Sequence, residues 1–207
     1  MKSYIHFIRH GITEGNLKRW YYGSMNIPLA EEGLAAINEL KAQSIYPPLK
    51  EAQCYTSGLI RTEQTLQAIY GDVPHESMPL LREMNFGAWE GKTFEELKSE
   101  KEFDTWVNAT DGSFTFPGGG DSIDSFYARI SEGLKELRGV HRLNELSHRH
   151  NGRDAVSIVV CHGGVIAAIM EILFPGEREN FWQWIPDPGH GYTVYFENSD
   201  PDSYEQF

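Results

Sequence analysis

The stretch SYIHFIRHG, residues 3–11, decides how the rest of the chain is interpreted. Its first six residues, Ser3–Ile8, are mostly apolar, which is typical of a buried strand. Arg9 and His10 then place a guanidinium beside an imidazole, and Gly11 opens a short polar run. This sequence continues a strand poorly, but it suits an anion site that contains a nucleophile. Arginine offers a planar fork of donors, neutral histidine can attack phosphorus, and glycine lets the backbone approach a ligand closely.

Two further apolar segments end in a similar way. Arg61 follows Ala52–Tyr55 after one short turn, and His162 directly follows Val156–Cys161, the most apolar segment of the chain. In open α/β sheets, ligands bind in the crevice beyond the carboxyl ends of the strands. Each residue also has a plainer interpretation, Arg61 as a surface helix arginine and His162 as a histidine at the edge of the core. The three signals together favour one shared anion site.

Alternating strand-like and helix-like segments predict an α/β fold. Strand patterns cover Ser3–Ile8, Ala52–Thr56, Val156–Cys161 and Tyr192–Glu197, and more weakly Pro74–Met78. Helical patterns cover Glu31–Ser44, Leu59–Tyr70, a long segment from Ser122 through Leu137 with Asp121 as its expected N-cap, and Gly163 through Leu173. We therefore expect a mostly parallel central sheet flanked by helices on both faces. The Gly-rich, aromatic stretch 84–120 is expected to be a cap insertion over the strand C-terminal ends, within a single domain spanning residues 1–207.

The composition limits the class of protein. A chain of 207 residues with 40% hydrophobic residues can bury a full core, and its net charge of −12 argues against general nucleic-acid binding. No apolar run approaches the roughly 18 residues of a membrane span, and no signal-peptide pattern opens the chain. We therefore expect a cytoplasmic protein that binds no membrane. Cys54 and Cys161 fall in predicted core strands and are expected to be buried thiols.

Five motifs now follow one another along the chain. They are RHGITEGN at 9–16, PLAEEG at 28–33, TSGLIRT at 56–62, REMNFGAWEG at 82–91 and CHGG at 161–164. In this order they resemble the histidine phosphatase superfamily, whose branches include cofactor-dependent phosphoglycerate mutases and many small phosphatases. The segment around Glu83 and the run PGGGDS at 117–122 are most similar to the phosphatase branch, especially α-ribazole phosphatase-type enzymes.

The resemblance implies a role for each catalytic candidate. His10 would attack phosphorus and become phosphohistidine, which splits hydrolysis into two displacements. Arg9, Arg61 and His162 would surround the three equatorial oxygens, so that cationic and donor groups stand in for a metal ion. Glu83 would protonate the leaving alkoxide and then accept a proton from the attacking water. The resemblance thus implies neither a metal nor a cofactor.

Substrate-binding roles are implied for Asn16, Thr13 and Gly163, the last through amides at the start of a helix. Asn16 and Thr13 also have a plainer interpretation, in which they satisfy turn amides. On residue chemistry alone, Glu90 competes with Glu83 for the acid role. Three departures from the family pattern stand out: Ala30 replaces a threonine, the run at 117–122 carries an extra glycine and an aspartate, and the loop Ile185–Gly191 with His190 matches no family motif.

A histidine-containing stretch lies outside these motifs. His141, His148 and His150 occur among Arg142, Arg149 and Arg153. No carboxylate or cysteine completes a sensible set of metal ligands here, so we interpret the stretch as a solvated loop.

The choice between mutase and phosphatase rests on the cap. A mutase must hold a second acidic group of its substrate, but no arginine occurs between Arg82 and Arg129, and the lysines between them alternate with glutamates. We therefore predict a phosphatase that acts on a small phosphomonoester, with α-ribazole 5′-phosphate as the candidate. A phosphoglycerate mutase and a non-catalytic phospho-ligand binding domain remain alternatives. The sequence leaves the oligomeric state open, with a homodimer as one option.

Overall fold

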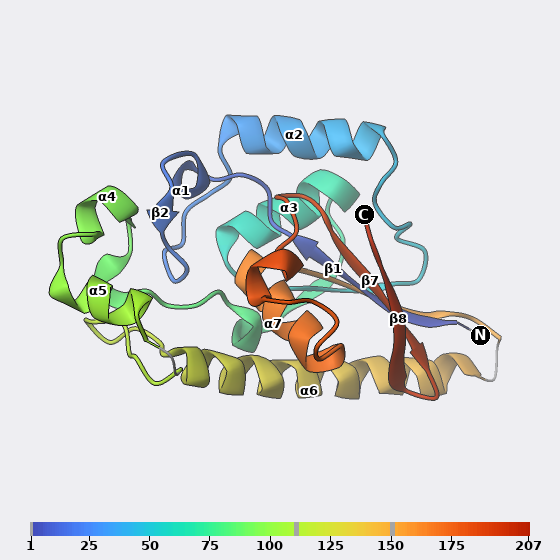
Figure 1. Cartoon of the computed structure of the whole chain (residues 1–207). Coiled ribbons are helices and arrows are strands. Elements are labelled where there is room, and N and C mark those ends of the chain that lie inside the picture. The colour runs from blue at the N-terminus through green and yellow to red at the C-terminus, as the bar shows by residue number, and fades with distance from the viewer. Residues whose placement is uncertain (1, 110–111, 150–151) are drawn as a thin grey trace.

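The computed structural model describes residues 2–109, 112–149 and 152–207. In this part of the chain, six strands form a central sheet in the order β4-β3-β6-β1-β7-β8. The strands are β1 (Ser3–Arg9), β3 (Gln53–Thr56), β4 (His75–Ser77), β6 (Ala155–Cys161), β7 (Gly191–Glu197) and β8 (Asp200–Gln206). The first four strands of that order are parallel neighbours, whereas β7 is antiparallel to both β1 and β8. The predicted α/β fold with a mostly parallel sheet is confirmed (Figure 1).

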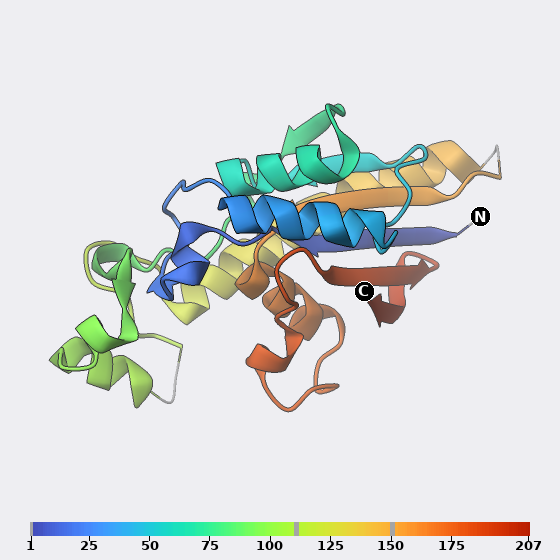
Figure 2. The same cartoon turned by 90° about the horizontal axis from the view of Figure 1, so that it is seen from above.

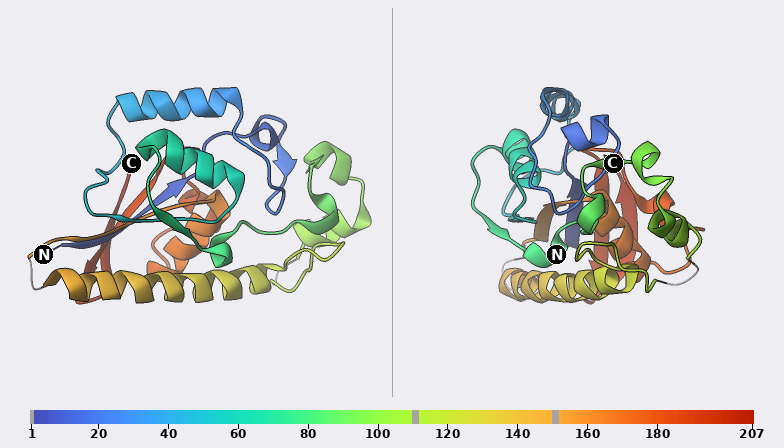
Figure 3. Two further views of the ribbon diagram at one scale, coloured as in Figure 1. Left: turned by 180° about the vertical axis from the view of Figure 1, so that it is seen from behind. Right: turned by 90° about the vertical axis from the view of Figure 1, so that its left-hand side faces the viewer.

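Helices cover both faces of this sheet. The main helices are α2 (Glu31–Ala42), α3 (Ile60–Tyr70), α6 (Ile123–Arg149) and α7 (Gly163–Leu173). Side chains alternate across a strand, so Phe7 of β1 packs into the cluster shared with α6 and α7, and Ile8 packs into the one shared with α2 and α3. The end-on view in Figure 3 shows α2 and α6 on opposite sides of the sheet. Cys54 and Cys161 are free, buried thiols, as predicted.

The cap has a small hydrophobic core of its own. It contains η2 (Gly87–Trp89), β5 (Lys92–Thr93), α4 (Phe94–Leu97) and α5 (Lys101–Val107), with Trp89 and Phe103 buried at its centre. The segment β2 (Trp20–Tyr21) pairs with β5 in a second, two-stranded sheet, so the chain just after α1 (Glu14–Leu17) also supports the cap. Figures 1 and 2 show α4 and α5 beyond the end toward which β1 points.

The expected N-cap of the long helix is wrong. α6 begins at Ile123, and the preceding residue, Ser122, accepts the amide of Ser125 at 3.0 Å while its own amide donates to the Ser125 hydroxyl at 2.8 Å. These reciprocal bonds satisfy the free donors of the first helical turn. The Asp121 carboxylate instead accepts the Nη2 of Arg129 at 2.9 Å. Asp121 therefore braces the entry to the helix without capping it.

The interpretation of the histidine-containing stretch as a solvated loop is also wrong, because α6 continues through it to Arg149. His141 is buried, with Nε2 2.9 Å from the Ser3 hydroxyl and Nδ1 2.8 Å from the Ser157 hydroxyl. The face that this part of the helix buries is polar, so the apolar spacing that marks a helix stops too early. His150 lies outside the described residues.

Strand β8 was not predicted. It is mostly exposed and polar, and it lies at the edge of the sheet after a tight turn. In that turn Asn198 and Ser199 have φ of 53° and 67°, which is typical of the two-residue turns that join hairpin strands. Within the ranges that the structure covers, no helix has the length and apolar character that crossing a membrane requires.

Candidate active site

The two histidines of the predicted site follow neighbouring strand ends. Arg9 and Cys161 are paired across β1 and β6, so the residues after them, His10 and His162, emerge side by side. Their ring centroids are 5.2 Å apart in an edge-to-face arrangement. The exposed fraction is 4% for His10 and 0% for His162. Parallel pairing therefore brings together residues that lie about 150 positions apart in the sequence.

The hydrogen bond of His10 determines which ring nitrogen is available for chemistry. Nδ1 lies 2.7 Å from the carbonyl oxygen of Gly11. A carbonyl only accepts, so Nδ1 carries the proton and the neutral ring has its lone pair on Nε2. Burial, together with the nearby charge of Arg61, lowers the pKa of His10 well below its ordinary value of 6.5. The ring is therefore neutral at physiological pH, with Nε2 able to act as a nucleophile.

Arg61 is a buried residue and not a surface arginine. It lies in the first turn of α3 and is 0% exposed. Nη1 donates to the carbonyl of Met25 and Nη2 to that of Gly23, each at 2.7 Å. Its buried Nε has no hydrogen-bond partner among the described residues. Two backbone carbonyls thus hold the guanidinium in place and leave its Nε–H without a partner in the described chain.

Arg9 is held by the loop that matched no family motif. Its Nη1 donates to the carbonyl of Pro186 at 2.7 Å, and its backbone amide donates to the carbonyl of His190 at 2.9 Å. The buried Nε of Arg9, like that of Arg61, has no partner in the part of the chain that the structure describes. The loop Ile185–Gly191 therefore positions a site arginine through main-chain groups.

His162 has a partner that sequence reasoning missed. Its Nε2 lies 2.8 Å from the hydroxyl of Ser57, which is fully buried and directly follows β3. The buried Nδ1 of His162 has no partner within the described residues. Burial and the charge of Arg61 lower the pKa of His162 well below its ordinary value. The signal for Ser57 was its position, since it is the first residue after a buried parallel strand.

The two candidate acids have different surroundings. The carboxylate of Glu83 lies at the N-terminus of α7, where Oε2 accepts the amide of Gly164 at 2.9 Å. Glu90 accepts the amides of Gly23 and Ser24 at 2.9 Å and that of Met25 at 3.0 Å. Glu90 thus fixes the loop whose carbonyls hold the Arg61 guanidinium. The carboxyl group of Glu83 therefore lies at Gly164, in the helix that follows His162, whereas Glu90 acts on the site only through the loop that holds Arg61.

Thr13 and Asn16 form a reciprocal cap on α1. The Oδ1 of Asn16 accepts the amide of Thr13 at 2.9 Å, and the Thr13 hydroxyl accepts the amide of Asn16 at 3.4 Å. Tyr22, which was not predicted, donates its hydroxyl to the Asn16 Oδ1 at 2.9 Å. Its ring also lies over the Arg61 guanidinium, 5.3 Å from the Cζ atom. The cap orients Asn16 so that its Nδ2 group is the donor left for a ligand.

Glycine is required at the start of α7 by the close approach of two site side chains. A Cβ on Gly163 would lie 3.1 Å from the Nε of Arg9, and one on Gly164 would lie 2.5 Å from a carboxylate oxygen of Glu83.

Arg129 is a further residue that the sequence did not indicate. It donates to the carbonyls of Arg82 at 2.6 Å and Glu83 at 3.2 Å, and so braces the segment that carries the carboxylate.

The site therefore combines a buried nucleophile with buried donors. Three buried nitrogens of these residues have no partner in the described chain: Arg9 Nε, Arg61 Nε and His162 Nδ1. A buried donor without a partner is costly, and about 1–3 kcal/mol is lost for each such group. A tetrahedral dianion whose oxygens accept these donors would recover that cost, and it would present its central atom to Nε2 of His10. This arrangement fits phosphoryl transfer.

Comparison with known proteins supports this assignment. The family model of the histidine phosphatase superfamily (branch 1) matches residues 5–204. The adenosylcobalamin/alpha-ribazole phosphatase of Escherichia coli (strain K12) is 28% identical, over 88% of this chain and 84% of that protein. A 2,3-bisphosphoglycerate-dependent phosphoglycerate mutase of Bradyrhizobium diazoefficiens is 27% identical, over 80% of this chain and 78% of that protein.

A solved structure shows the same fold. The alpha-ribazole phosphatase from Shigella flexneri superposes with a TM-score of 0.74 at 22% identity, covering 96% of this chain and 93% of that one. The family match spans nearly the whole chain and includes every motif quoted above. The chain therefore belongs to branch 1 of the histidine phosphatase superfamily and is an enzyme of the phosphatase class.

Proposed function

We propose that this enzyme hydrolyses a small phosphomonoester through a phosphohistidine at Nε2 of His10. The observation that carries the proposal is the state of that ring: neutral, tied through Nδ1 to the Gly11 carbonyl, and surrounded by buried donors that have no partner among the described residues. A structural histidine at a strand end has no need of two buried guanidinium groups beside it. A nucleophile for phosphorus does.

In the first displacement, Nε2 of His10 forms a bond to phosphorus while the ester P–O bond breaks. Arg9, Arg61 and His162 donate to the three equatorial oxygens, whose charge they stabilise as the transition state forms. The departing alkoxide takes a proton from the Glu83 carboxyl group. The products are the free alcohol, a phosphohistidine and a Glu83 carboxylate.

In the second displacement, water attacks the phosphohistidine from the face that the alcohol has left. Glu83, now a carboxylate, accepts a proton from this water as the P–O bond forms and the P–N bond breaks. Inorganic phosphate leaves, and His10 returns to its neutral state with Nδ1 still bonded to the Gly11 carbonyl. The Gly164 amide, 2.9 Å from Oε2, keeps the carboxylate in one position through both steps.

The cap favours hydrolysis over mutase chemistry. Two of its three lysines form ion pairs with glutamates of the cap: Lys92 lies 3.1 Å from Glu100, and Lys98 pairs with Glu95. A mutase needs cations there to hold the second acidic group of its substrate while phosphate moves between two positions. The buried part of the cap is aromatic instead, centred on Trp89. These aromatic side chains pack against one another and supply no cation for a second acidic group.

We propose a nucleoside 5′-phosphate of the α-ribazole 5′-phosphate type as the substrate. Support comes from relatives whose names include alpha-ribazole phosphatase. The departures at Ala30 and at residues 117–122 lie outside the group of catalytic side chains. Ala30 precedes α2 and makes no side-chain cap, so it changes a helix end and not the phosphate site.

The test is phosphate release in the presence of EDTA from three esters: α-ribazole 5′-phosphate, p-nitrophenyl phosphate and 3-phosphoglycerate. Wild type is compared with His10→Ala and with a matched control, His148→Ala, whose ring is remote from the site and bonds the Asp154 carbonyl. We expect EDTA-insensitive release, highest with α-ribazole 5′-phosphate, that is lost only in His10→Ala.

Three results would overturn the proposal. Isomerisation of 3-phosphoglycerate in the presence of 2,3-bisphosphoglycerate, without net phosphate release, would make the enzyme a mutase. Saturable binding of the esters without turnover would make the chain a phospho-ligand binding domain. Release that is equal in wild type and His10→Ala would place the chemistry elsewhere.

A further inference from the structure

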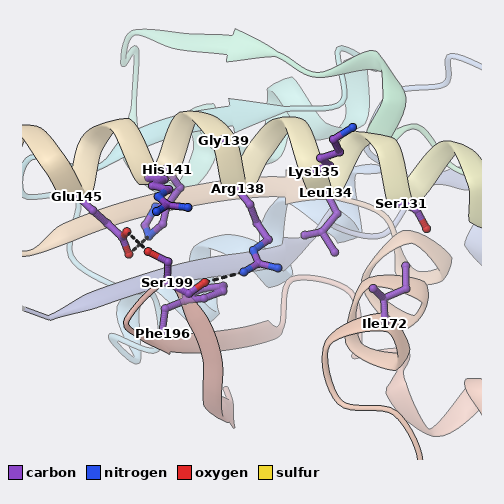
Figure 4. Close-up of a pocket in the computed structure, with 11 residues that line it drawn as sticks. Ser131, Leu134, Lys135, Arg138, Gly139, His141, Glu145, Ile172, Phe196 and Ser199 are labelled. Carbon is purple, nitrogen blue, oxygen red and sulfur yellow. Dashed lines mark hydrogen bonds and ion pairs between the residues drawn. The ribbon is translucent and has the colours of Figure 1, made fainter.

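A second cavity lies away from the catalytic residues. It is bounded by residues 131–145 of α6, by α7 and by the turn between β7 and β8 (Figure 4), and its volume is about 350 Å³. This volume falls in the range of small-molecule sites. One wall residue, His141, bonds Ser3 at the start of β1, whereas the catalytic end of that strand is six residues further on, roughly 20 Å away at about 3.3 Å per residue.

Two arginines give this cavity an excess of positive charge. Arg138 and Arg142 line it, and neither forms an ion pair with any residue that the structure describes. The one acidic lining residue, Glu145, already accepts hydroxyl groups from Ser3 and, at 2.9 Å, from Ser199. Its charge is therefore stabilised locally by two hydroxyl groups, and the arginines are left without an anion.

Arg138 is held in a conformation that suits recognition of a planar or tetrahedral anion. Nη2 donates to the carbonyl of Ser199 at 2.6 Å, and the guanidinium lies over the ring of Phe196, with Cζ 5.7 Å from its centroid. Figure 4 shows it directed between α6 and the β7–β8 turn. Lys135 points away in the same view, and its Nζ lies 3.8 Å from Glu132. The fixed guanidinium, and not the lysine, supplies the directed donors.

Gly139 leaves the helix backbone bare on the wall of the cavity. A glycine inside a helix costs about 1 kcal/mol relative to alanine, so it usually has a packing reason. Gly133 of the same helix has one, since its Cβ would lie 2.8 Å from a side-chain carbon of Leu81. A Cβ on Gly139 would meet nothing within 4 Å, although Gly139 lines the cavity. No contact within the described chain accounts for this glycine.

We propose that this cavity is a second binding site, for a small organic anion with an apolar or aromatic body. The anionic group is taken by Arg138 and Arg142. The body packs against Phe196 and Ile172 and against the helix backbone that Gly139 leaves bare. Nothing in this proposal depends on the reaction at His10, and the two sites are separated by the length of β1.

The probe for this site is naphthalene sulfonate, an aromatic anion that the phosphatase reaction does not consume. It is titrated into the isotopically labelled full chain, and binding is followed by amide chemical shifts. We expect saturable shifts at Gly139, Arg138 and Ser199. Shifts at Gly163 and Gly164 report any binding in the catalytic site, so the two sites are read separately in one experiment.

Three variants connect the shifts to the cavity. Arg138→Gln removes the fixed guanidinium and should weaken binding by about 10-fold or more, because a charge-assisted hydrogen bond to the anion is lost. Gly139→Ala places a methyl group in the cavity and should weaken binding by roughly 5-fold. The same change should raise Tm by about 2–4 °C, because alanine favours the helix. Lys135→Gln, the matched control, should leave binding unchanged.

The rise in Tm of Gly139→Ala shows that the variant is folded, so its weaker binding cannot come from unfolding. Absence of shifts at Gly139 and Ser199 at millimolar probe would overturn the proposal. So would binding that Arg138→Gln and Gly139→Ala leave unchanged. Shifts confined to Gly163 and Gly164 would overturn it as well, since they would assign all anion binding to the catalytic site.

Discussion

Buried histidines lie at both ends of strands β1 and β6. His141, at the strand starts, has surroundings opposite to those of His10, which lies beside His162 at the strand ends. At the strand starts, His141 uses both ring nitrogens, one on Ser3 and one on Ser157. At the strand ends, His10 uses only Nδ1, on the Gly11 carbonyl, and lies beside the charge of Arg61. Burial lowers the pKa of both rings, to about 4 for His141.

The two histidines are equally buried, so what distinguishes the structural histidine from the catalytic one is hydrogen bonding and not burial. A buried histidine with both nitrogens bonded adds to stability, because every polar group it faces is satisfied. A buried histidine with a lone pair left over, next to fixed guanidinium groups, has a reactive atom kept away from water.

Removing each histidine should give opposite phenotypes. We expect His10→Ala to lower kcat by on the order of 10⁴- to 10⁶-fold, as the loss of a nucleophile does, with little change in Tm. His141→Ala should leave the Ser157 hydroxyl without its imidazole partner, remove one of the two partners of the Ser3 hydroxyl, and cost about 2–4 kcal/mol of unfolding free energy. Its activity per folded molecule should stay near wild type. Steady-state kinetics and thermal unfolding of both variants test this prediction. An equal loss of activity in the two variants would contradict it.

Arg61→Gln should lower kcat by about 10²- to 10³-fold, because one fixed donor to the developing charge is lost. The matched control is Arg138→Gln, which removes an arginine that also bonds a backbone carbonyl but lies at the other end of the strands. It should keep wild-type kcat. A comparable loss of kcat in both variants would mean that the net positive charge of the protein, and not the position of Arg61, supports catalysis.

Buried histidines should make the stability depend on pH, and His141 is one of them. Its pKa is about 4 in the folded chain against an ordinary 6.5, so the unfolded state takes up the proton first as pH falls. The contribution of His141 to the free energy of unfolding should be lost between pH 6.5 and 4, and it amounts to about 3 kcal/mol. His6, His10 and His162, whose pKa values are also lowered, should add losses of the same sign. His141→Gln, which cannot titrate, should show a shallower slope over that window in denaturant unfolding. An unchanged slope would assign the effect to other groups.

Tyr22→Phe should have the smallest effect. It removes the hydroxyl that bonds the Asn16 Oδ1 but keeps the ring over Arg61. Loss of one such hydrogen bond should raise KM by roughly 2- to 10-fold and leave kcat nearly unchanged. Tyr195→Phe, whose hydroxyl bonds Glu205 on the exposed edge of the sheet, is the control for loss of a tyrosine hydroxyl. Equal effects of the two changes would remove Tyr22 from the site.

Much of this site follows from sequence because apolar strands are easy to recognise and parallel pairing aligns their ends. Arg9, His10 and His162 lie at or directly after such strands, and the structure brings them together. Arg61 required the additional inference that a helix starting after β3 turns its first residues toward the same edge. These inferences depend on local periodicity and on one topological rule.

The parts that were missed have no local signal. The buried face of α6 beyond Leu137 is polar, so it resembles a loop until Ser3 and Ser157 are seen to face it. Strand β8 is polar because it lies at an edge. Tyr22 and Ser57 act through partners that are distant in the sequence or fixed by another strand. Each case depends on tertiary neighbours, which a periodic pattern does not report.

The most direct test of the central claim is detection of the phosphoenzyme. Glu83→Gln removes the base of the second step, so after mixing with p-nitrophenyl phosphate, whose leaving group needs little acid help, phosphohistidine should accumulate. Intact mass and peptide mapping should then find one acid-labile phosphate, on His10, and none in the His10→Ala/Glu83→Gln double variant. A phosphate on another residue, or phosphate release by Glu83→Gln at the wild-type rate with no adduct, would contradict the account.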